Sequence, residues 1–347
     1  MFRGVDFYSD TLTKPTEAMR KAIAQAEVGD EQKGEDPTTL KLEEKMAEIL
    51  GFSAVIFLPS ATMANQIAIR SQCEPGDEVI AWENAHIFLA EAGGPAVHSG
   101  VLAKPIHSKD GVFSAEDVKA AYRSIKGAHY PVSRLVCVEN TTNMGGGVAW
   151  PKEKLDAVIT ASKEFGLRLH LDGSRLFNAS IAAGLSLREL AASFDTVTIC
   201  LSKGLGCPAG AILAFDKNQY LKIRRLKQLM GGSLRQSGIL AAAGLYALDH
   251  HVVRLQEDHD NAARFARFLQ DLDAVVVENP LPSTNMVYFG LRNSKIGDRI
   301  FLNRCEELGI RFSHVGENRF RAVTHLDIKK VDIERAITVL KEVFKSV

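Results

Sequence analysis

Four kinds of side chain occur in the sequence just after short apolar runs: a carboxylate, a guanidinium, an amine and two hydroxyls. These side chains are Asp172 and Arg175, Lys203, and Ser60 with Thr62. Each has an ordinary structural explanation when taken alone, because an aspartate often ends a strand, a lysine is usually solvated and hydroxyls often cap helices. Taken together, they offer an acid, an amine and the N-terminus of a helix that could bind an anion.

This combination matches the requirements of pyridoxal phosphate. That cofactor needs an amine for its Schiff base, a carboxylate to keep its pyridine nitrogen protonated, and an anion site for its phosphate. The sequence has no G-x-G-x-x-G after a predicted strand, no Walker A lysine, and no His or Cys spacing typical of a metal site. We therefore predict a pyridoxal-phosphate enzyme with the cofactor on Lys203, and no metal.

The elements that must position these residues form an α/β pattern between residues 52 and 250. Short, almost continuously apolar runs alternate with amphipathic helical stretches such as Lys152–Glu164 and Leu187–Ala192. Such runs are typical of strands buried on both faces of a mostly parallel, doubly wound sheet, which binds ligands at the carboxyl ends of its strands. The expected strands are Ala54–Leu58, Glu78–Trp82, Leu135–Glu139, Leu167–Leu171, Val197–Leu201 and Ala211–Phe215.

The rest of the chain has a different pattern. Residues 1–51 are expected to form an N-terminal segment with two helices, Thr16–Ala26 and Thr38–Leu50, separated by a loop rich in Gly and Asp. Residues 251–347 predict a smaller α+β domain. Its expected elements are Asn261–Leu272, Val275–Val277, Asn285–Phe289, Lys295–Leu308, Phe320–Val323 and Ile333–Phe344.

Composition argues against several classes of partner. The 42 Lys and Arg residues balance the 42 Asp and Glu residues, so no nucleic-acid or membrane partner is expected. No apolar stretch approaches the roughly 18 residues that a membrane span needs, and the first residues do not resemble a signal peptide. The five cysteines are scattered and form no CxxC pair, which indicates a reducing compartment and a cytoplasmic protein.

Several motifs, in a fixed order, resemble the low-specificity L-threonine aldolases. The resemblance runs over nearly the whole chain. It implies the aspartate-aminotransferase-like fold, that of fold-type I pyridoxal-phosphate enzymes. The motifs are Asp6–Thr11, Glu27–Asp30, Gly34–Pro37, Pro59–Asn65, Ala85-His86, His129–Pro131, Glu139-Asn140, His170–Asn178, Leu201–Gly206, Gly231–Gly238 and Arg321–His325.

The resemblance implies roles for the cofactor-binding residues. Lys203 would form the Schiff base and Asp172 would pair with the protonated pyridine nitrogen. Ser60, Ala61 and Thr62 would bind the phosphate at a helix N-terminus, and Arg235 would reach the phosphate of a neighbouring subunit. The family usually has Gly where Ala61 stands, so we expect a negative φ or mild strain there.

The resemblance also implies how an amino-acid substrate would bind. His86 would stack on the pyridine ring and, with His129, would surround the substrate's β-hydroxyl. Ser9, Arg175 and Arg321 would hold its carboxylate, a task suited to the forked guanidinium of arginine. Family members are homotetramers built from dimers, with sites completed across the dimer interface. His170 is expected to be structural.

Four positions depart from the family pattern. The family commonly has Tyr at Lys33, His at Thr142, Ala at Cys207 and Lys near Gln228. Lys33 is expected to affect the entrance to the site or its pH dependence. None of the four belongs to the expected cofactor core, so the departures bear on specificity more than on chemistry.

The resemblance implies retro-aldol cleavage of L-threonine, L-allo-threonine and related β-hydroxy-α-amino acids to glycine and an aldehyde. The catalytic residues would be Lys203, His86, His129 and Asp172. A β-eliminating lyase or an aminotransferase on the same scaffold is the nearest alternative. A catalytically silent cofactor-binding protein is a further one, although such a protein would need neither the lysine nor both arginines.

Overall fold

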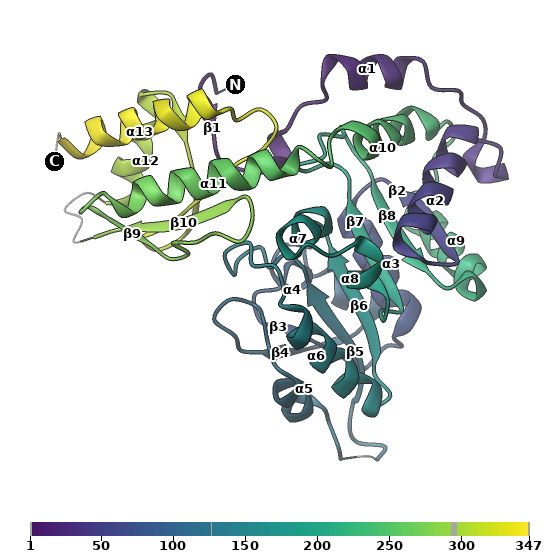
Figure 1. Cartoon of the computed structure of the whole chain (residues 1–347). Coiled ribbons are helices and arrows are strands. Elements are labelled where there is room, and N and C mark those ends of the chain that lie inside the picture. The colour runs from purple at the N-terminus through teal and green to yellow at the C-terminus, as the bar shows by residue number, and fades with distance from the viewer. Residues whose placement is uncertain (1, 126, 293–296, 346–347) are drawn as a thin grey trace.

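A computed structural model describes residues 2–125, 127–292 and 297–345. These residues form two sheets, which helices surround, and a separate small pair of strands. Figure 1 shows the large sheet below and to the right, and the smaller sheet at the upper left, near both termini. The long helix α11 (Leu255–Gln270) leads from the first region into the second. Among the described residues, no helix combines the length and the apolar character needed to cross a membrane.

The large sheet has seven strands in the order β2-β8-β7-β6-β5-β3-β4. The strand β8 runs antiparallel to both of its neighbours, and all other pairings are parallel. This is the mostly parallel sheet that the apolar runs predicted. The strands are β2 (Ala54–Leu58), β3 (Asp77–Trp82), β4 (Leu102–Ile106), β5 (Val132–Glu139), β6 (Arg168–Gly173), β7 (Thr196–Cys200) and β8 (Ala211–Phe215).

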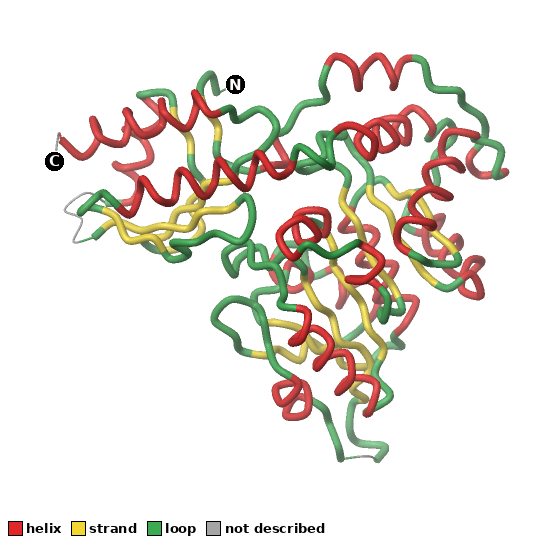
Figure 2. Tube along the Cα trace, viewed as in Figure 1, coloured by secondary structure: helices red, strands yellow, loops and turns green. Residues whose placement is uncertain are grey.

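Helices cover this sheet, as the red coils around the yellow strands of Figure 2 show. The helix α3 packs against β6, β7 and β8, while α10 packs against α1 and α2. The helices up to the end of this region are α1 (Glu17–Ala24), α2 (Pro37–Leu50), α3 (Ala61–Gln72), α4 (His86–Leu89), α5 (Ala115–Ala121), α6 (Lys152–Glu164), α7 (Leu176–Ala183), α8 (Leu187–Ala191), α9 (Tyr220–Leu229) and α10 (Gly238–His250). Short 3-10 helices are η1 (Asp10–Leu12), η2 (Glu31–Lys33) and η4 (Lys217–Gln219), and η3 (Pro95–Ser99) is a π-helix.

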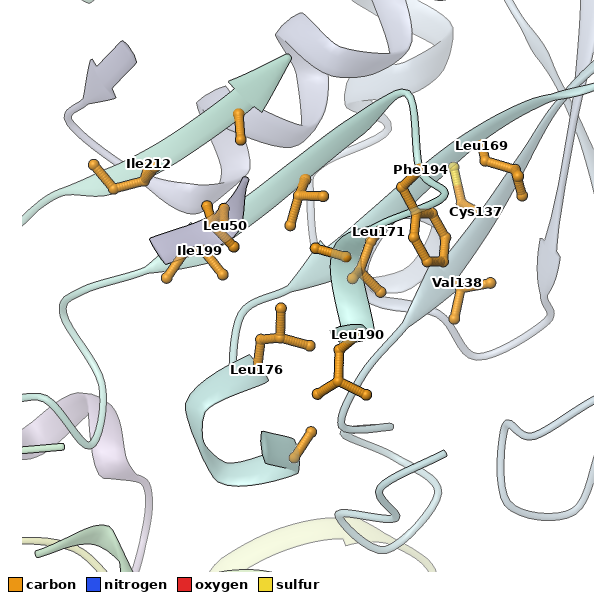
Figure 3. Close-up of a cluster of buried hydrophobic side chains, with 14 of the residues drawn as sticks. Leu50, Cys137, Val138, Leu169, Leu171, Leu176, Leu190, Phe194, Ile199 and Ile212 are labelled. Carbon is orange, nitrogen blue, oxygen red and sulfur yellow. The ribbon is translucent and has the colours of Figure 1, made fainter. Parts of the chain in front are cut away.

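The core of the large region explains the continuous apolar runs. Every residue of β3, β7 and β8 is buried, because helices pack on both faces of the sheet. In Figure 3, Leu190 of α8 and Phe194 lie against Leu171 of β6 and Val138 of β5. All four side chains are at most 5% exposed.

The smaller sheet is antiparallel, with strand order β12-β13-β10-β9, and three helices accompany it. This agrees with the α+β pattern expected after residue 251. The expected helix Lys295–Leu308 begins in residues outside the described part of the chain. The elements are β9 (Val275–Val277), β10 (Met286–Leu291), β11 (Ile310–Arg311), β12 (Ser313–Gly316), β13 (Arg319–Val323), α11, α12 (Asp298–Glu307) and α13 (Lys330–Lys345).

The N-terminal segment contacts both regions. The strand β1 (Val5–Asp6) pairs in parallel with β11 of the smaller domain, whereas α1 and α2 pack on α10 of the larger one. Phe7, which follows β1, is fully buried and stacks on Phe265 and Phe312, with ring centroids 5.4 and 5.6 Å apart. Residues 1–51 therefore pack on two hydrophobic cores.

Four short strands were not predicted from the sequence: β1, β4, β11 and β12. The edge strand β4 has a largely exposed pattern and contains Pro105, so it lacks the apolar run that marks the inner strands. The strands β11 and β12 have only two and four residues. Such short pairings follow from the docking of neighbouring elements and not from a local pattern.

We predict that Phe7→Ala lowers the free energy of unfolding by about 3–5 kcal/mol, because it removes a buried ring from the aromatic core of the smaller domain. Chemical denaturation would measure the loss. Tyr8→Ala is the matched control, since the Tyr8 side chain is 48% exposed and its loss should cost about 1 kcal/mol or less. Equal losses in the two variants would contradict this account of the core.

Candidate active site

The residues singled out by type and spacing meet in one cavity of about 190 Å³ at the carboxyl ends of the parallel strands. Asp172 lies near the end of β6, and Lys203 lies three residues after the end of β7. The structure thus brings the amine and the carboxylate to the same edge of the sheet. The lining residues are Ser9, Thr11, His86, Ala90, Glu139, Thr141, Asn143, Asp172, Ser174, Arg175, Lys203 and Arg321.

Two glycines are required by the backbone at this edge. A Cβ on Gly173 would lie 2.7 Å from the carbonyl oxygen of Thr198 on β7, so only glycine fits beside that strand. Gly206, which follows Lys203, has a φ of +76°, a left-handed conformation that favours glycine. Gly173 is the last residue of β6, directly after Asp172, and Gly206 belongs to the turn that carries Lys203.

Asp172 is an ionised carboxylate despite being only 3% exposed. Its Oδ1 accepts a hydrogen bond from the Ser174 backbone N–H (3.1 Å) and its Oδ2 accepts one from Asn65 Nδ2 (2.9 Å). Burial opposes ionisation, but the positive charges of His86 and Lys203 and the Ser174 hydrogen bond together lower the pKa of Asp172. A buried anion of this kind is suited to pairing with a protonated pyridine nitrogen.

A chain of hydrogen bonds supports this carboxylate from behind. Asn65 Oδ1 lies 3.1 Å from His170 Nε2, and His170 Nδ1 lies 2.8 Å from Thr196 Oγ1. Burial lowers the pKa of His170 to about 4, so its ring is neutral at pH 7. Because Asn65 Oδ1 can only accept, His170 Nε2 carries the hydrogen. His170 is thus a supporting residue, as expected, and it fixes the orientation of the Asn65 amide.

His86 begins α4 and its side chain lines the cavity, 32% exposed. Its backbone N–H donates to Glu139 Oε2 (2.6 Å), and its Nδ1 lies 2.8 Å from Glu91 Oε1. Glu139 also accepts from the backbone N–H of Asn143 (2.6 Å). Burial, followed by the nearby charge of Asp172, raises the pKa of Glu139.

Arg175 lines the cavity, but most of its guanidinium nitrogens already form hydrogen bonds. Its Nε and Nη2 each donate to a carboxylate oxygen of Asp10 at 2.7 Å, and both side chains are at least 94% buried. Its Nη1 lies 3.3 Å from Asn143 Oδ1. Asp10 occupies the Nε and Nη2 edge, so the expected contact of Arg175 with a substrate carboxylate would use its Nη1 side.

Arg321, on β13 of the smaller domain, approaches the cavity from the other side. Its Nη1 donates to the same Asn143 Oδ1 (2.9 Å), and its Nη2 lies 3.3 Å from the Tyr8 carbonyl oxygen. Its buried Nε has no hydrogen-bond partner among the described residues. Ser9 also lines the cavity and caps η1 through a bond from the Thr11 N–H. The two guanidinium groups form a cationic wall.

Ser60, Ala61 and Thr62 lie at the N-terminus of α3, outside the cavity lining. Ser60 caps the helix by accepting from the Met63 N–H, at 3.2 Å. Ala61 is the first helical residue, and the left-handed non-glycine residues in the described chain are Ala92 and Asn318, so Ala61 has no strained φ. Asn65, one turn further along α3, contacts Asp172. The helix terminus is thus next to the site and suits an anion.

Comparison with known proteins decides the family. The family model for beta-eliminating lyases matches residues 6–291. A probable low-specificity L-threonine aldolase 2 of Arabidopsis thaliana is 40% identical over 99% of this chain and 98% of its own length. The chain belongs to the low-specificity L-threonine aldolases, within the beta-eliminating lyase family. The resemblance read from the motifs is confirmed.

Solved structures show the same fold as this aldolase-family chain. The threonine aldolase of Leishmania major superposes with a TM-score of 0.84 at 22% identity, covering 97% of this chain and 99% of its own. A structure of SPT with PLP bound superposes with a TM-score of 0.76 at 16% identity, covering 99% of this chain and 87% of its own. Both likenesses support the fold-type I architecture.

Two residues with expected roles lie away from the cavity of this aldolase-family chain. His129 is exposed in the connection between α5 and β5, which leads to the amino end of β5, whereas the cavity lies at the carboxyl ends. Arg235 is 63% exposed and lies near Asp30 and Gln32. Within one chain, neither side chain reaches the cavity.

The positions that depart from the family pattern do not line the cavity either. Lys33 and Gln228 are exposed, whereas Thr142 and Cys207 are buried. The Thr142 backbone forms an isolated bridge with Val148, close to Asn143. The departures therefore leave the lysine, the carboxylate and the two arginines unchanged.

Several residues of the site were not predicted from the sequence. Asn65, Glu139 and Asp10 stand within the motifs that the family shares, but their partners became visible only in the fold. Asn143 ends the family pattern Glu-Asn-Thr-x-Asn that starts at Glu139, whereas Glu91 had no local signal, because a single Glu in a loop usually reflects solvation. The donor atoms of His86, Glu91 and Asp172 lie within 4.8 Å of one another, a grouping that their hydrogen bonds explain.

We predict that His170 makes stability depend on pH. Its pKa is about 4 in the fold and 6.5 in its unperturbed state. The stability that its neutral form contributes is therefore complete above pH 6.5 and is lost as the pH falls toward 4. This 2.5-unit difference corresponds to about 3 kcal/mol at most.

The comparison uses the melting temperature between pH 7.5 and 4.5. Wild type should lose more stability on acidification than His170→Asn, which has no titrating ring. His107→Asn is the control, since the His107 side chain is 82% exposed. If His170→Asn and wild type lose the same amount, the buried ring is not the acid-sensitive group.

Proposed function

We propose that this protein is a pyridoxal-phosphate-dependent aldolase that cleaves L-threonine, L-allo-threonine and related β-hydroxy-α-amino acids to glycine and an aldehyde. The observation that carries the proposal is the meeting of Lys203, Asp172 and His86 with Arg175 and Arg321 around one cavity. The membership of the chain in the threonine aldolase family supports the same activity.

The residues present fit pyridoxal phosphate. When bound, this cofactor supplies an electron sink for the charge that develops as a bond at Cα of an amino acid breaks. Lys203 offers the amine for its attachment, and no hydrogen bond or ion pair to its Nζ is found among the described residues. Asp172 stays ionised and can keep a pyridine nitrogen protonated. The N-terminus of α3 would bind the phosphate through Ser60, Ala61 and Thr62.

The cationic wall of the cavity would bind the substrate carboxylate. Both arginines turn an Nη1 toward Asn143, where an incoming carboxylate could replace the amide oxygen. Ser9 adds a hydroxyl at the same wall. The Asp10 pair holds Arg175 rigidly, so that binding of the carboxylate fixes how the Cα–Cβ bond is directed.

His86 would hold the β-hydroxyl of the substrate and would stack on the ring of the cofactor. Its Nδ1 is engaged by Glu91, and its Nε2 has no hydrogen-bond partner among the described residues. In the neutral form of the ring, Nε2 has a lone pair and can therefore accept the hydroxyl proton as the Cα–Cβ bond breaks. His129 would complete this part of the site from a neighbouring subunit.

The placing of His129 and Arg235 supports a homotetramer with sites completed at a dimer interface. Both side chains are exposed and distant from the cavity of their own chain, as residues that serve a partner's site would be. A cytoplasmic location fits the five buried, unpaired cysteines.

We also propose that residues 1–51 connect two domains, 52–250 and 251–347, because residues 1–51 pack on both.

We predict that Lys203→Ala abolishes the visible absorption of bound pyridoxal phosphate and lowers turnover of L-threonine by at least about 1,000-fold. Lys203→Arg is the matched variant, because it retains the charge but has no primary amine. Both variants should fail alike if the amine is what matters. Full absorption and turnover in either variant would refute the assignment of Lys203.

Beta-elimination is the second candidate, because the family model that matches the chain is named for it. The products distinguish the two reactions: aldol cleavage of L-threonine releases glycine and acetaldehyde, whereas elimination releases ammonia and a keto acid. We expect glycine and acetaldehyde in equal amounts from the purified holoenzyme, with L-threonine and L-allo-threonine assayed separately. Stoichiometric ammonia and keto acid would instead establish the lyase.

A further inference from the structure

Glu91 is a buried carboxylate beside the active site that does not line the cavity. Its side chain is fully buried, and three side chains donate to it. Oε1 accepts from Asn65 Nδ2 at 2.8 Å and lies 2.8 Å from His86 Nδ1, while Oε2 accepts from Gln66 Nε2. A buried carboxylate with this many donors is held in one orientation.

The contact with Glu91 determines which nitrogen of His86 carries a hydrogen. An ionised carboxylate can only accept, so the nitrogen that faces it, Nδ1, must be protonated. In the neutral ring Nε2 then has the lone pair. The backbone N–H of His86 is separately bound to Glu139, so both the ring and the start of α4 are fixed.

The charges around His86 come from four elements. Glu91 follows α4, Asp172 is on β6, Glu139 ends β5 and Lys203 follows β7. Burial opposes protonation of the ring, but the Glu91 hydrogen bond and the charges of Asp172 and Glu91 raise the pKa of His86. Lys203 acts in the opposite direction. Glu91 is the only one of these groups that is bonded to the ring itself in the described structure.

Asn65 connects this pair to the cofactor carboxylate. Its single amide group donates to Glu91 Oε1 and to Asp172 Oδ2, at 2.8 and 2.9 Å. His170 holds the amide in this orientation from the other side. The two buried carboxylates therefore share one donor, and a shift of either would disturb the other.

We propose that Glu91 is a positioning residue for the reaction. It sets the tautomer and the ring orientation of His86, and through Asn65 it holds that ring in a fixed position relative to Asp172. The inference rests on the proposed function, because it assumes that His86 contacts the substrate hydroxyl. The alternative is a purely structural carboxylate that joins α3 to the loop after α4. That role predicts a loss of stability without a change in the behaviour of His86.

Glu91→Gln tests the proposal, because it keeps the size of the side chain, removes the charge and allows the amide to donate as well as accept. In the full-length chain without cofactor, modification of His86 by diethyl pyrocarbonate can be followed by mass spectrometry as a function of pH. The midpoint of reactivity should fall by about one pH unit or more, because the negative partner is gone. An unchanged midpoint would overturn the proposal.

The kinetics of the holoenzyme provide the second measurement. We expect Glu91→Gln to lower kcat for L-threonine by about 10- to 100-fold, with a smaller change in KM. In a His86→Asn background the same substitution should have little further effect, since its action passes through His86. Equal, independent losses in the two backgrounds would refute the role assigned to Glu91.

Glu83→Gln is the matched control. Glu83 contacts His107 Nδ1 in a second Glu–His pair of the chain, and the His107 side chain is 82% exposed outside the cavity. Glu83→Gln should leave kcat and the midpoint of His86 modification unchanged.

If Glu91→Gln does not fold, Glu91→Asp keeps the charge but is one methylene too short. Wild-type kcat and midpoint in that variant would count against the proposal, and a reduced kcat would support it.

The outcomes separate this inference from the proposed function. The modification midpoint of His86 is independent of turnover, so it reports on the Glu91 contact even if the wild-type protein cleaves no threonine. Conversely, a wild-type enzyme that yields glycine and acetaldehyde, with a Glu91→Gln variant that titrates normally, would retain the aldolase and refute the positioning role.

Discussion

The active site depends on keeping the Asp172 carboxylate ionised inside the protein. An isolated buried carboxylate would take up a proton, because a low-dielectric interior disfavours charge. Here His86 and Lys203 supply positive charge, and Asn65 and Ser174 supply hydrogen bonds. These four partners come from different parts of the chain. The requirement for one charge therefore constrains how α3, α4 and the turns after β6 and β7 pack together.

A second buried charge, Asp10, contacts residues of both sheet regions. Asp10 lies in the N-terminal segment, binds Arg175 of the large domain with both carboxylate oxygens, and lies 3.4 Å from Asn285 Nδ2 of the small domain. Burial works against its ionisation, but Arg175 lowers the pKa of Asp10 well below its usual range. Such pairs add little net stability, yet they favour one geometry over others. The cationic wall of Arg175 and Arg321 thus depends on how three parts of the chain pack together.

Much of the fold could be predicted because its inner strands are buried on both faces. The bounds of β2, β8, α6 and β9 agree with the expected ranges, since apolar runs and amphipathic stretches end abruptly at polar residues. The strand β4 was not predicted, because it is a largely exposed edge strand that contains Pro105. Of the expected site residues, six line the cavity: Lys203, Asp172, His86, Arg175, Arg321 and Ser9. Ser60, Ala61 and Thr62 lie outside its lining at the start of α3, and His129 and Arg235 lie away from it.

The sequence by itself determined the type of chemistry, because an amine, a carboxylate and a helix N-terminus must meet where parallel strands end. The tertiary structure alone decided which hydrogen-bond and charge partners these groups have. Glu91 meets His86 and Asn65 only because α3 and the loop after α4 pack together, and Asp10 occupies the fork of Arg175 across 165 residues of chain. Hydrogen bonds between distant residues leave no local pattern, since their geometry exists only after the elements have packed.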